Sequence, residues 1–499
     1  MMREFIGKHA SHIGLVLVLL LAAYLRFDGL GRNSLWLDEC SVANHALAGG
    51  LGDIIDRVAH DIHPPLLYFQ AYLTIEIFGK SESALRLPSA ILGIAACLFT
   101  YLLARSFVGR SSAILAAFLM AICPLAIYNS QQLRPYSHLS FMGALAAFAM
   151  IKLAQKRSVW RTTGIALLFA AMLYTHYVAI FFIISLVASF LVVYWRERGM
   201  RMAVVIASLG SLLLFSPWIP VLINQTDDKI GHLWPFGLSS IWDMFFSEGP
   251  FSGAASDGVI SIGASILMAA VCAGVLRTLL KKGLKTNKAR LAIVICPLVF
   301  FGVGFLMSLH RPFYRPKSGL IIYPLLMTLA AMGLEWLASL PKRAAIRHLT
   351  AATLFVVLVS FGLVSAHQSK APRYIDGRGM ALYIRDNIPS DPIIVDCNYV
   401  HGLEFYITLA CPDYPSDRIM VVKDLSDFRL QMHRARRFSR FWLVSVLDEP
   451  SPVWEYSLDN FEVLKKVEYY KISAALLTWP EEQKRAISSR RRRAASGTE

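Results

Sequence analysis

The sequence is poor in acidic residues, in paired cysteines and in the glycine motifs of nucleotide-binding proteins. It has 34 Asp and Glu against 50 Lys and Arg, and charged residues make up 17% of its 499 residues. No GxGxxG follows a strand pattern and no phosphate loop occurs, which argues against a nucleotide-binding enzyme. The 7 cysteines include no CxxC pair and no metal-binding cluster is visible, so a zinc site is not expected. Cys397 and Cys411 are the candidates for an extracytoplasmic disulfide, because the others mostly fall inside apolar runs.

Apolar residues are abundant instead. They make up 56% of the chain, and the mean hydropathy is +0.50, which predicts a polytopic membrane protein. The formal charge of +16 does not indicate nucleic-acid binding, because the basic residues lie in short clusters between apolar runs, as the positive-inside rule produces. The first apolar stretch, 12–25, has no small-residue cleavage site and is therefore interpreted as a retained first span.

The apolar runs predict about eleven transmembrane helices. They are placed at 13–30, 84–105, 112–129, 136–153, 160–175, 177–195, 201–220, 258–276, 291–309, 317–337 and 346–366. A further run, 64–78, is shorter, contains Gln70 and Glu76 and begins with two prolines, so we place it along the membrane interface.

Positive charge supports this placement. It puts the basic clusters at 105–110, 152–161, 196–201, 277–290 and 342–347 on the cytoplasmic side. The segments 31–83, 130–135, 221–257 and 310–316, the turn at His176 and everything after 367 then lie outside. The basic cluster 310–317 is the exception, and it is either a loop that departs from the rule or an anion site.

The composition changes to a soluble pattern near residue 367. Alternating apolar residues predict strands at 392–396 and 441–446, with helices at 377–388, 402–408 and 424–437 between them. We therefore expect a membrane module over 1–366 with a catalytic outer loop at 31–83, and a small extracytoplasmic α/β domain over 367–485. The basic end, 486–499, is expected to be a disordered tail.

The outer segments contain both acids and cations. Asp38 and Glu39 follow Trp36, an ordinary interfacial anchor, and acids at this depth lose hydration unless they meet cations or take part in chemistry. Each of the other residues alone has an ordinary structural explanation, but together they outline a polar cavity at the membrane surface. They are His60, Asp61, His63, Arg86, Gln132, Arg134, Tyr136, His176, Arg311, Arg315 and Lys317.

This inventory suits a phosphate carried on a lipid. Arg and Lys bind a phosphodiester through charge-assisted hydrogen bonds. A nearby carboxylate can accept a proton from an incoming hydroxyl or amine. The leaving lipid phosphate is a weak base, so the second acid that glycosidases use is not required.

The order of the motifs resembles glycosyltransferase families 39 and 83, which have the GT-C superfold and include protein O-mannosyltransferases and the lipid A aminoarabinose and galacturonic acid transferases. The motifs are LWLDE, HPPLLYF, ALRLPSAILG, QLRPY, YTHY and RPFYRP, within residues 10–340. The resemblance implies a sugar donor on a polyprenyl phosphate and Asp38 as the catalytic base, with Glu39 as the runner-up. It also implies that His63, if protonated, approaches the donor phosphate, and that Arg134 and Tyr136 line the same cavity.

The function predicted from the sequence is an inverting glycosyltransferase of the bacterial cytoplasmic (inner) membrane, acting on the periplasmic face. Arg134, Arg311 or Arg315 would hold the donor phosphate, and the acceptor is left open among glycolipid, polysaccharide and protein. A lipid or glycan transporter is the alternative and would show mid-bilayer charges and broken helices; an envelope scaffold is a third. No cofactor is implied, although a divalent cation stays open because Asp38, Glu39 and Asp61 offer hard oxygen ligands.

Overall fold

The structure is a computed structural model, and most of the polar and apolar segments discussed above fall within its described part. The described residues are 2–47, 49–226, 258–280, 288–309, 316–340, 376–387, 391–396, 405–407, 409–410, 418–422, 424–435, 438–446, 451–469 and 472–480. Arg311, Arg315, Cys397, Cys411, the predicted span 346–366 and the tail 486–499 lie outside them.

The chain divides into two units, which are taken one at a time below. The helical unit contains Met1–Leu30 and Ala48–Ala371, and the α/β unit contains Gly31–Leu47 and Pro372–Glu499. The short segment Gly31–Leu47, which begins the predicted outer loop 31–83, therefore belongs with the C-terminal residues. It does not belong with the membrane helices that flank it in the sequence.

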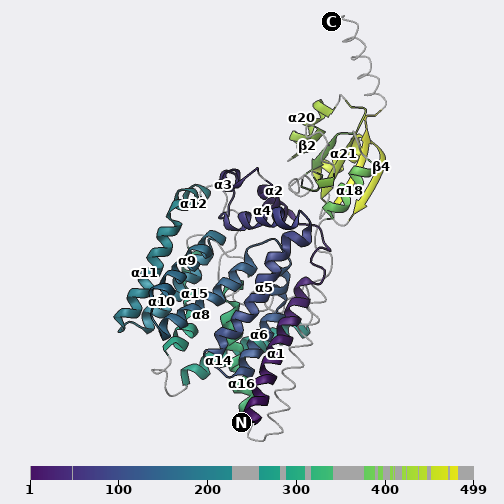
Figure 1. Ribbon diagram of the computed structural model, residues 1–499. Coiled ribbons are helices and arrows are strands. Elements are labelled where there is room, and N and C mark those ends of the chain that lie inside the picture. Colours follow the sequence, from purple (N-terminus) through teal and green to yellow (C-terminus); the bar gives the residue numbers. More distant parts are fainter. Residues whose placement is uncertain are drawn as a thin grey trace, which may run out of the picture. The chain divides into compact units, whose positions relative to one another are not determined.

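The helical unit is built from apolar helices (Figure 1). They are α1 (Met2–Phe27), α3 (Leu51–Ala59), α4 (Leu66–Phe78), α5 (Glu82–Arg105), α6 (Arg110–Ile122), α7 (Pro124–Ser130), α8 (Tyr136–Gln155), α9 (Val159–Thr175), α10 (Ala179–Val193), α11 (Arg198–Phe215), α12 (Ile219–Thr226), α14 (Gly258–Leu280), α15 (Lys288–Ser308) and α16 (Tyr323–Ser339), with 3-10 turns η1 (Ser216–Trp218) and η3 (Pro316–Ile322).

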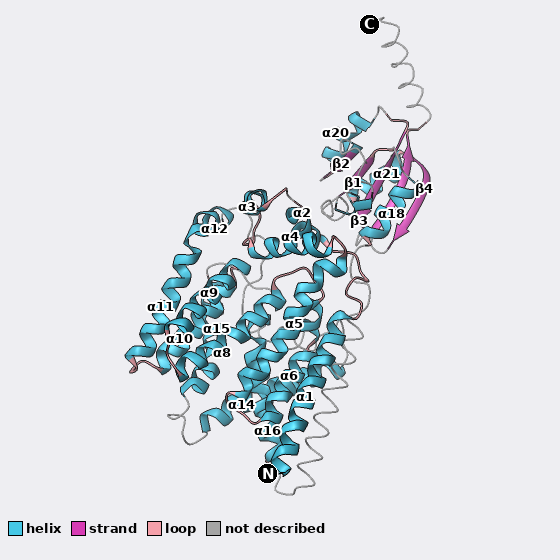
Figure 2. Ribbon diagram, in the orientation of Figure 1, coloured by secondary structure: helices cyan, strands magenta, loops and turns pink. Residues whose placement is uncertain are grey.

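This unit is a polytopic helical membrane protein. Within the described residues, 5 helices are long and apolar enough to cross a bilayer, or 6 if the bent pair α6 and α7 is one span. Shorter apolar helices occupy 12–27, 66–78, 159–175, 179–193 and 265–279. The predicted number of about eleven spans therefore stays a prediction. Helix α4 crosses the ends of the neighbouring helices instead of running along them (Figure 2), which fits the interfacial position expected for 64–78.

Helix α5 lies at the centre of the bundle and packs against α1, α6, α8 and α16. Its first turn is capped by Ser81, whose Oγ accepts a hydrogen bond from the Ala84 N–H at 3.2 Å. Small buried residues, among them Ala90, Gly93 and Ala96, let the neighbouring helices approach closely. Helix α16 is covered over most of its length, so these two helices form the core of the unit.

The predicted span 112–129 is wrong as a single straight helix. It is broken into α6 and α7, which meet at an angle of 59°. Pro124 has no N–H and cannot continue the ladder of α6, so the last carbonyl groups of α6 lose their helical partners. The 13 residues of α6 rise only about 20 Å, less than the roughly 30 Å of hydrocarbon, so the break lies at membrane depth.

Arg26 satisfies the carbonyl groups that the break releases. Its side chain is 0% exposed, and its guanidinium donates to Met120 O at 3.2 Å and to Ala121 O at 3.1 Å. The amide of Gln131, just after α7, in turn donates to Asp28 O at 2.9 Å and Leu25 O at 3.2 Å at the end of α1. The end of α1 and the break between α6 and α7 therefore hold each other.

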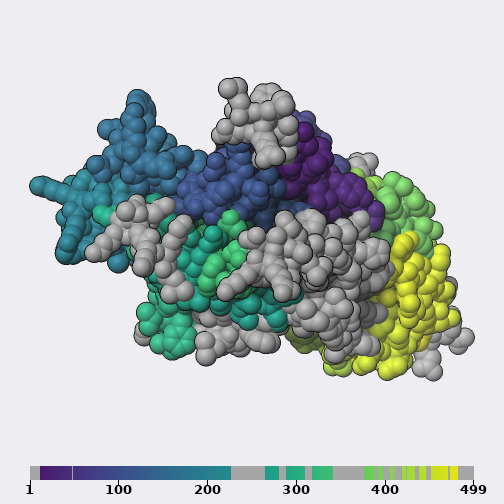
Figure 3. All heavy atoms as spheres, turned by 90° about the horizontal axis from the view of Figure 1, so that it is seen from below, coloured from purple at the N-terminus to yellow at the C-terminus, as the bar shows by residue number. Residues whose placement is uncertain are grey.

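Aromatic and basic residues lie at the start of α9, directly after the end of α10 and at the start of α11. Trp160 is 87% and Trp195 60% exposed, and the Arg196 guanidinium lies 4.6 Å from the Trp195 ring centroid. Viewed from the end where α1 begins, these helices form the blue projecting part of the helical unit (Figure 3). Exposed Trp beside Arg is typical of a membrane–water interface.

The α/β unit contains a mixed sheet. Its strands are β1 (Ile393–Asp396), β2 (Ile419–Val422), β3 (Arg440–Val446), β4 (Glu462–Tyr469) and β5 (Ile472–Thr478), and its helices are α2 (Leu37–Ala46), α18 (Gly377–Asn387), α20 (Leu425–Ala435) and α21 (Pro452–Asn460). The strand order is β2-β1-β3-β5-β4, with β1 parallel to β2 and β3 and with β5 antiparallel to β3 and β4.

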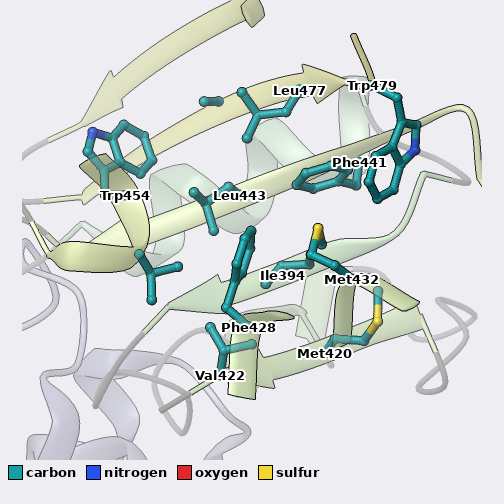
Figure 4. Close-up of a cluster of buried hydrophobic side chains, with 12 residues drawn as sticks. Ile394, Met420, Val422, Phe428, Met432, Phe441, Leu443, Trp454, Leu477 and Trp479 are labelled. Carbon is teal, nitrogen blue, oxygen red and sulfur yellow. The ribbon is translucent and has the colours of Figure 1, made fainter. Parts of the chain in front are cut away.

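One face of this sheet buries a continuous apolar core (Figure 4). Phe428 and Met432 of α20 and Trp454 of α21 pack against Ile394, Phe441, Leu443 and Leu477 of the strands. These strands and helices include the segments 392–396, 441–446, 377–388 and 424–437 that the sequence pattern placed, and the described residues 405–407 of segment 402–408 are also helical.

Close packing of α14 on α16 generates a first prediction. A Cβ on Gly333 would lie 1.8 Å from Ala270 O, and that oxygen belongs to the backbone, so the helices would have to separate. We expect Gly333→Ala to reduce the free energy of unfolding by about 2 kcal/mol, measured by thermal unfolding in detergent. Gly302→Ala on α15 is the control, because nothing lies within 4 Å of its Cβ. An equal change in both variants would contradict the prediction.

Candidate active site

Four separate segments of the helical unit bring polar side chains to one place. His63 precedes α4, Arg134 and Tyr136 lie at the start of α8, His176 lies in the turn between α9 and α10, and Lys317 lies in η3. Ring contacts join them: the His176 ring centroid is 5.2 Å from that of His63 and 5.8 Å from that of Tyr136. We call these five residues the phosphate cluster, for reasons given below. The sequence predicted all of them.

The backbone explains how the cluster forms. Pro64 and Pro65 start α4 directly after His63, and Pro135 starts α8 directly after Arg134, so both side chains project from the ends of helices. Lys317 lies near α8 because η3 packs on α8 at Gly143. A Cβ on Gly143 would lie 2.4 Å from Ile321 O of η3. A glycine two turns along α8 therefore places a cation near Tyr136.

Two cations lie beside the same aromatic ring. Lys317 Nζ is 5.2 Å and the Arg134 guanidinium carbon 6.0 Å from the Tyr136 ring centroid. Arg134 is 5% exposed, so its charge is screened weakly by water. Both charges also act on His176, where they lower its pKa. The local potential is positive and suits an anion.

His176 is neutral. It is 9% exposed, and burial, together with the charges of Arg134 and Lys317, lowers the pKa of His176 to about 3. Its Nδ1 accepts a hydrogen bond from the Val178 N–H at 3.1 Å, so the ring proton is on Nε2. His176 can therefore donate a hydrogen bond to a ligand without carrying charge.

His63 contacts Arg134. Arg134 Nη2 lies 3.3 Å from His63 Nε2, and since a guanidinium can only donate, the imidazole nitrogen accepts in this hydrogen bond. The contact orients Arg134. The expectation that a protonated His63 approaches the donor phosphate stays a prediction.

The remaining predicted cavity residues of this unit have three kinds of surroundings. Asp61 accepts from the Tyr68 hydroxyl and from the Ile62 N–H, and Gln132 is buried at 2% exposure, so both lie in ordered surroundings. Arg86 is buried and donates to Leu30 O at 3.0 Å, which ties α5 to the end of α1. His60 is exposed at the end of α3. These contacts give Arg86 a structural role and leave His60 at the surface.

The acid pair lies in the first turn of α2, in the α/β unit. Glu39 is 0% exposed, and its Oε2 accepts from the Trp36 N–H at 3.3 Å, so it caps its own helix. Asp38 is partly exposed. Glu39 is thus buried in a helix-capping role, and the choice of Asp38 as the base stays a prediction.

Sequence reasoning missed two features of this region. Arg26 was taken as part of an ordinary span. An Arg within an apolar run, together with an Ile-Cys-Pro sequence that breaks another apolar run, is a signal for a buried Arg that caps the broken helix. The attachment of residues 31–36 to the C-terminal unit has no local sequence signal. Among the described residues, no group of three or more His, Cys, Asp or Glu could hold a metal ion.

Comparison with known proteins agrees with this architecture. Residues 62–221 match the family model for dolichyl-phosphate-mannose-protein mannosyltransferase. ArnT from Cupriavidus metallidurans in the apo state superposes with a TM-score of 0.63 and 15% identity, over 94% of this chain and 98% of that one. AglB, an archaeal oligosaccharyltransferase from Archaeoglobus fulgidus, superposes with a TM-score of 0.57 and 13% identity over 88% and 69%. The chain has the GT-C fold that these solved structures share. The resemblance predicted from the motifs is thereby confirmed.

Sequence relatives match over shorter stretches. A protein of Aquifex aeolicus (strain VF5) without an assigned function is 29% identical over 140 residues, 27% of this chain and 28% of that protein. YkcB of Bacillus subtilis (strain 168), a mannosyltransferase by name, is 30% identical over 98 residues, 19% of this chain and 14% of that protein. The matched stretch thus spans less than a third of either relative.

The neutral state of His176 generates a prediction about pH. Between pH 7 and pH 5 the unfolded chain takes up a proton at this histidine, whose ordinary pKa is about 6.5, whereas the folded protein does not. Folding stability should therefore fall with decreasing pH, by about 2 kcal/mol more in the wild type than in His176→Asn. Asn Oδ1 can still accept from the Val178 N–H.

Unfolding midpoints measured at pH 7 and pH 5 for both proteins test this. Parallel losses in the wild type and in His176→Asn would show that this histidine takes up a proton as readily in the folded state as in the unfolded state, contrary to the low pKa of His176.

Proposed function

We propose that the protein is an inverting glycosyltransferase that moves a sugar from a polyprenyl-phosphate donor to an acceptor at the extracytoplasmic face of the bacterial inner membrane. The observation that carries the proposal is the phosphate cluster, in which Arg134 and Lys317 lie beside Tyr136 and a neutral His176. The same fold holds undecaprenyl phosphate in a second ArnT structure, with a TM-score of 0.58, and dolichol-phosphate in the AglB structure.

The cluster has the chemistry that a lipid phosphodiester needs. Arg134 offers a planar set of donors that fits phosphate oxygens, and Lys317 adds a second charge. The neutral His176 supplies a hydrogen bond through Nε2. His63 holds the guanidinium of Arg134 in orientation through the 3.3 Å contact. Arg311 and Arg315, outside the described residues, are proposed as further phosphate ligands because they closely precede Lys317 in the sequence.

The proposed chemistry is a single displacement. An acceptor O–H or N–H attacks the anomeric carbon of the donor sugar, the bond from that carbon to the phosphate oxygen breaks, and polyprenyl phosphate leaves. The acceptor proton passes to Asp38. The leaving phosphate is stabilised by the cations and takes no proton, so one base and several cations suffice. Attack opposite the leaving group inverts the configuration of the sugar.

The transporter alternative called for broken helices, and one is present at α6 and α7. In transporters the released backbone groups face the substrate. Here two of the carbonyl groups at the end of α6, Met120 O and Ala121 O, accept hydrogen bonds from Arg26. Arg26 is fully buried. The break is therefore closed by protein, which supports the enzyme over the transporter.

Replacing the proposed base tests the reaction. We expect Asp38→Asn to lower sugar transfer by at least about 1,000-fold because the acceptor then lacks a base, while binding of undecaprenyl phosphate is kept. Transfer is measured by mass spectrometry of envelope glycans, glycolipids and glycoproteins in a deletion strain complemented at equal membrane abundance.

Glu39→Gln is the matched control for Asp38→Asn, because the Gln side-chain oxygen can still accept from the Trp36 N–H. It should keep most of the transfer activity. Identical profiles for Asp38→Asn, wild type and the undeleted strain would reject Asp38 as the base and reopen the transporter and scaffold alternatives.

Replacing Arg134 tests the phosphate cluster. We expect Arg134→Met to weaken binding of undecaprenyl phosphate by about 30-fold, because a buried charge-assisted contact is lost, and Arg134→Lys to weaken it less. Binding is measured with the purified protein in detergent. Arg201→Met, an exposed arginine in the first turn of α11, is the control and should leave the affinity unchanged. Equal affinities for Arg134→Met and wild type would remove the cluster from donor binding.

A further inference from the structure

The segment that leads into the acid pair, residues 31–36, is fastened to the C-terminal part of the chain. Both belong to the α/β unit, although more than 300 residues of sequence separate them. The contacts involve the start of α18 and Tyr406, and they are hydrogen bonds to both backbone and side chains of residues 31–36.

Ser34 is joined to the beginning of α18. Its hydroxyl donates to Asp376 Oδ1 at 3.0 Å and accepts from the Arg378 N–H at 3.3 Å. The same Asp376 oxygen accepts from the Gly379 N–H at 2.9 Å, so it caps α18 while it holds Ser34. Gly379 is needed at this place, because a Cβ there would lie 2.4 Å from Asp376 Oδ2.

The backbone on both sides of Ser34 is held as well. Arg378 Nη2 donates to Arg32 O at 2.9 Å, and its Nη1 lies 3.4 Å from Gly31 O. On the other side, the Leu35 N–H donates to Tyr406 Oη at 2.6 Å, and Leu35 is 0% exposed. A buried N–H needs such a partner, so the phenol oxygen defines where Leu35 lies.

These contacts end where the acid pair begins. Trp36 is extended, and α2 starts at Leu37, so Asp38 is the second residue of a helix whose entry point is fixed. Glu39 and the Cys40 thiol close the junction by hydrogen bonds back to Trp36 N and Leu35 O. The backbone of Asp38 therefore follows the anchored Leu35 by three residues.

We propose that the C-terminal unit is the platform that positions the catalytic base, with Asp376, Arg378 and Tyr406 as positioning residues. The role of Asp38 in this statement rests on the proposed function. Two other roles for such a unit would be acceptor recognition and closure as a lid. A platform differs from both, because its loss should affect the proton-transfer step while donor binding is kept.

A double-mutant cycle tests the platform. Ser34→Ala and Asp376→Ala each remove the contact between Ser34 and Asp376, and each should lower sugar transfer by about 10-fold or more, since small displacements of a catalytic group are costly. The double variant should be no worse than the more severe single variant, because both act through one contact. The affinity for undecaprenyl phosphate should not change in any of the three.

Two conservative controls separate positioning from folding. Asp376→Asn keeps an oxygen that can accept from both Ser34 Oγ and Gly379 N–H, and should restore transfer. Arg385→Gln alters an exposed ion pair with Asp386 in the same helix and should have no effect. Equal losses of transfer, donor affinity and thermal stability in Ser34→Ala and Asp376→Ala would overturn the proposal, as would additive losses in the double variant.

Hydrogen exchange gives a readout that does not depend on activity. Amide exchange in peptides covering residues 31–47 should be slow in the full-length protein and faster in Tyr406→Phe, which lacks the acceptor for the Leu35 N–H. Faster exchange with unchanged transfer would overturn the platform while the proposed function stands. Full activity in Asp38→Asn, with exchange still faster in Tyr406→Phe, would instead reject the proposed function.

Discussion

A broken helix inside a membrane must have its free carbonyl groups satisfied by protein, and Arg26 meets this need. Unsatisfied backbone groups in hydrocarbon each cost several kcal/mol, yet Pro124 forces α6 to end at Ile122. The buried guanidinium accommodates two of the released carbonyls. It can reach them because Gly93 has no side chain, since a Cβ there would lie 2.8 Å from Arg26 Nε. The direction of α7, and with it the route of the chain to Arg134, depends on this one contact.

The positive charges of the phosphate cluster also determine the protonation of His176. Once Arg134 and Lys317 lie near the same ring, protonating His176 would add a third charge in a buried place, so the imidazole stays neutral. His63 accepts a hydrogen bond from Arg134. His176 can therefore donate without competing with the arginine for an anionic ligand, and on the proposed function the charge that meets a phosphate comes from Arg and Lys, whose protonation does not vary near neutral pH.

The sequence predicted which residues of the helical unit would gather, because each sits at the end of an apolar run and the topology places those ends on one side. The HPP, LRP and THY motifs therefore led to His63, Arg134 and His176. Protonation could not be read in this way, since it depends on distances between segments far apart in the chain. The break at Cys123 does have a local signal in Pro124. The partners of Ser34, which are 342 residues away, have none. Local patterns predict helices and strands well, whereas long-range polar contacts have no period in the sequence.

The division of the chain assigns the two halves of the proposed reaction to different units. The residues proposed for the donor phosphate belong to the helical unit, whereas Asp38 belongs with the C-terminal residues although its segment lies between α1 and α3 in the sequence. A base has to match the group it deprotonates, and that group is on the acceptor. A displacement of Asp376, Arg378 or Tyr406 would then affect proton transfer to Asp38, while Arg134, His176 and Lys317 would still hold the donor phosphate. On the proposed function, the C-terminal unit and the acid-bearing segment therefore form one functional part that holds the base.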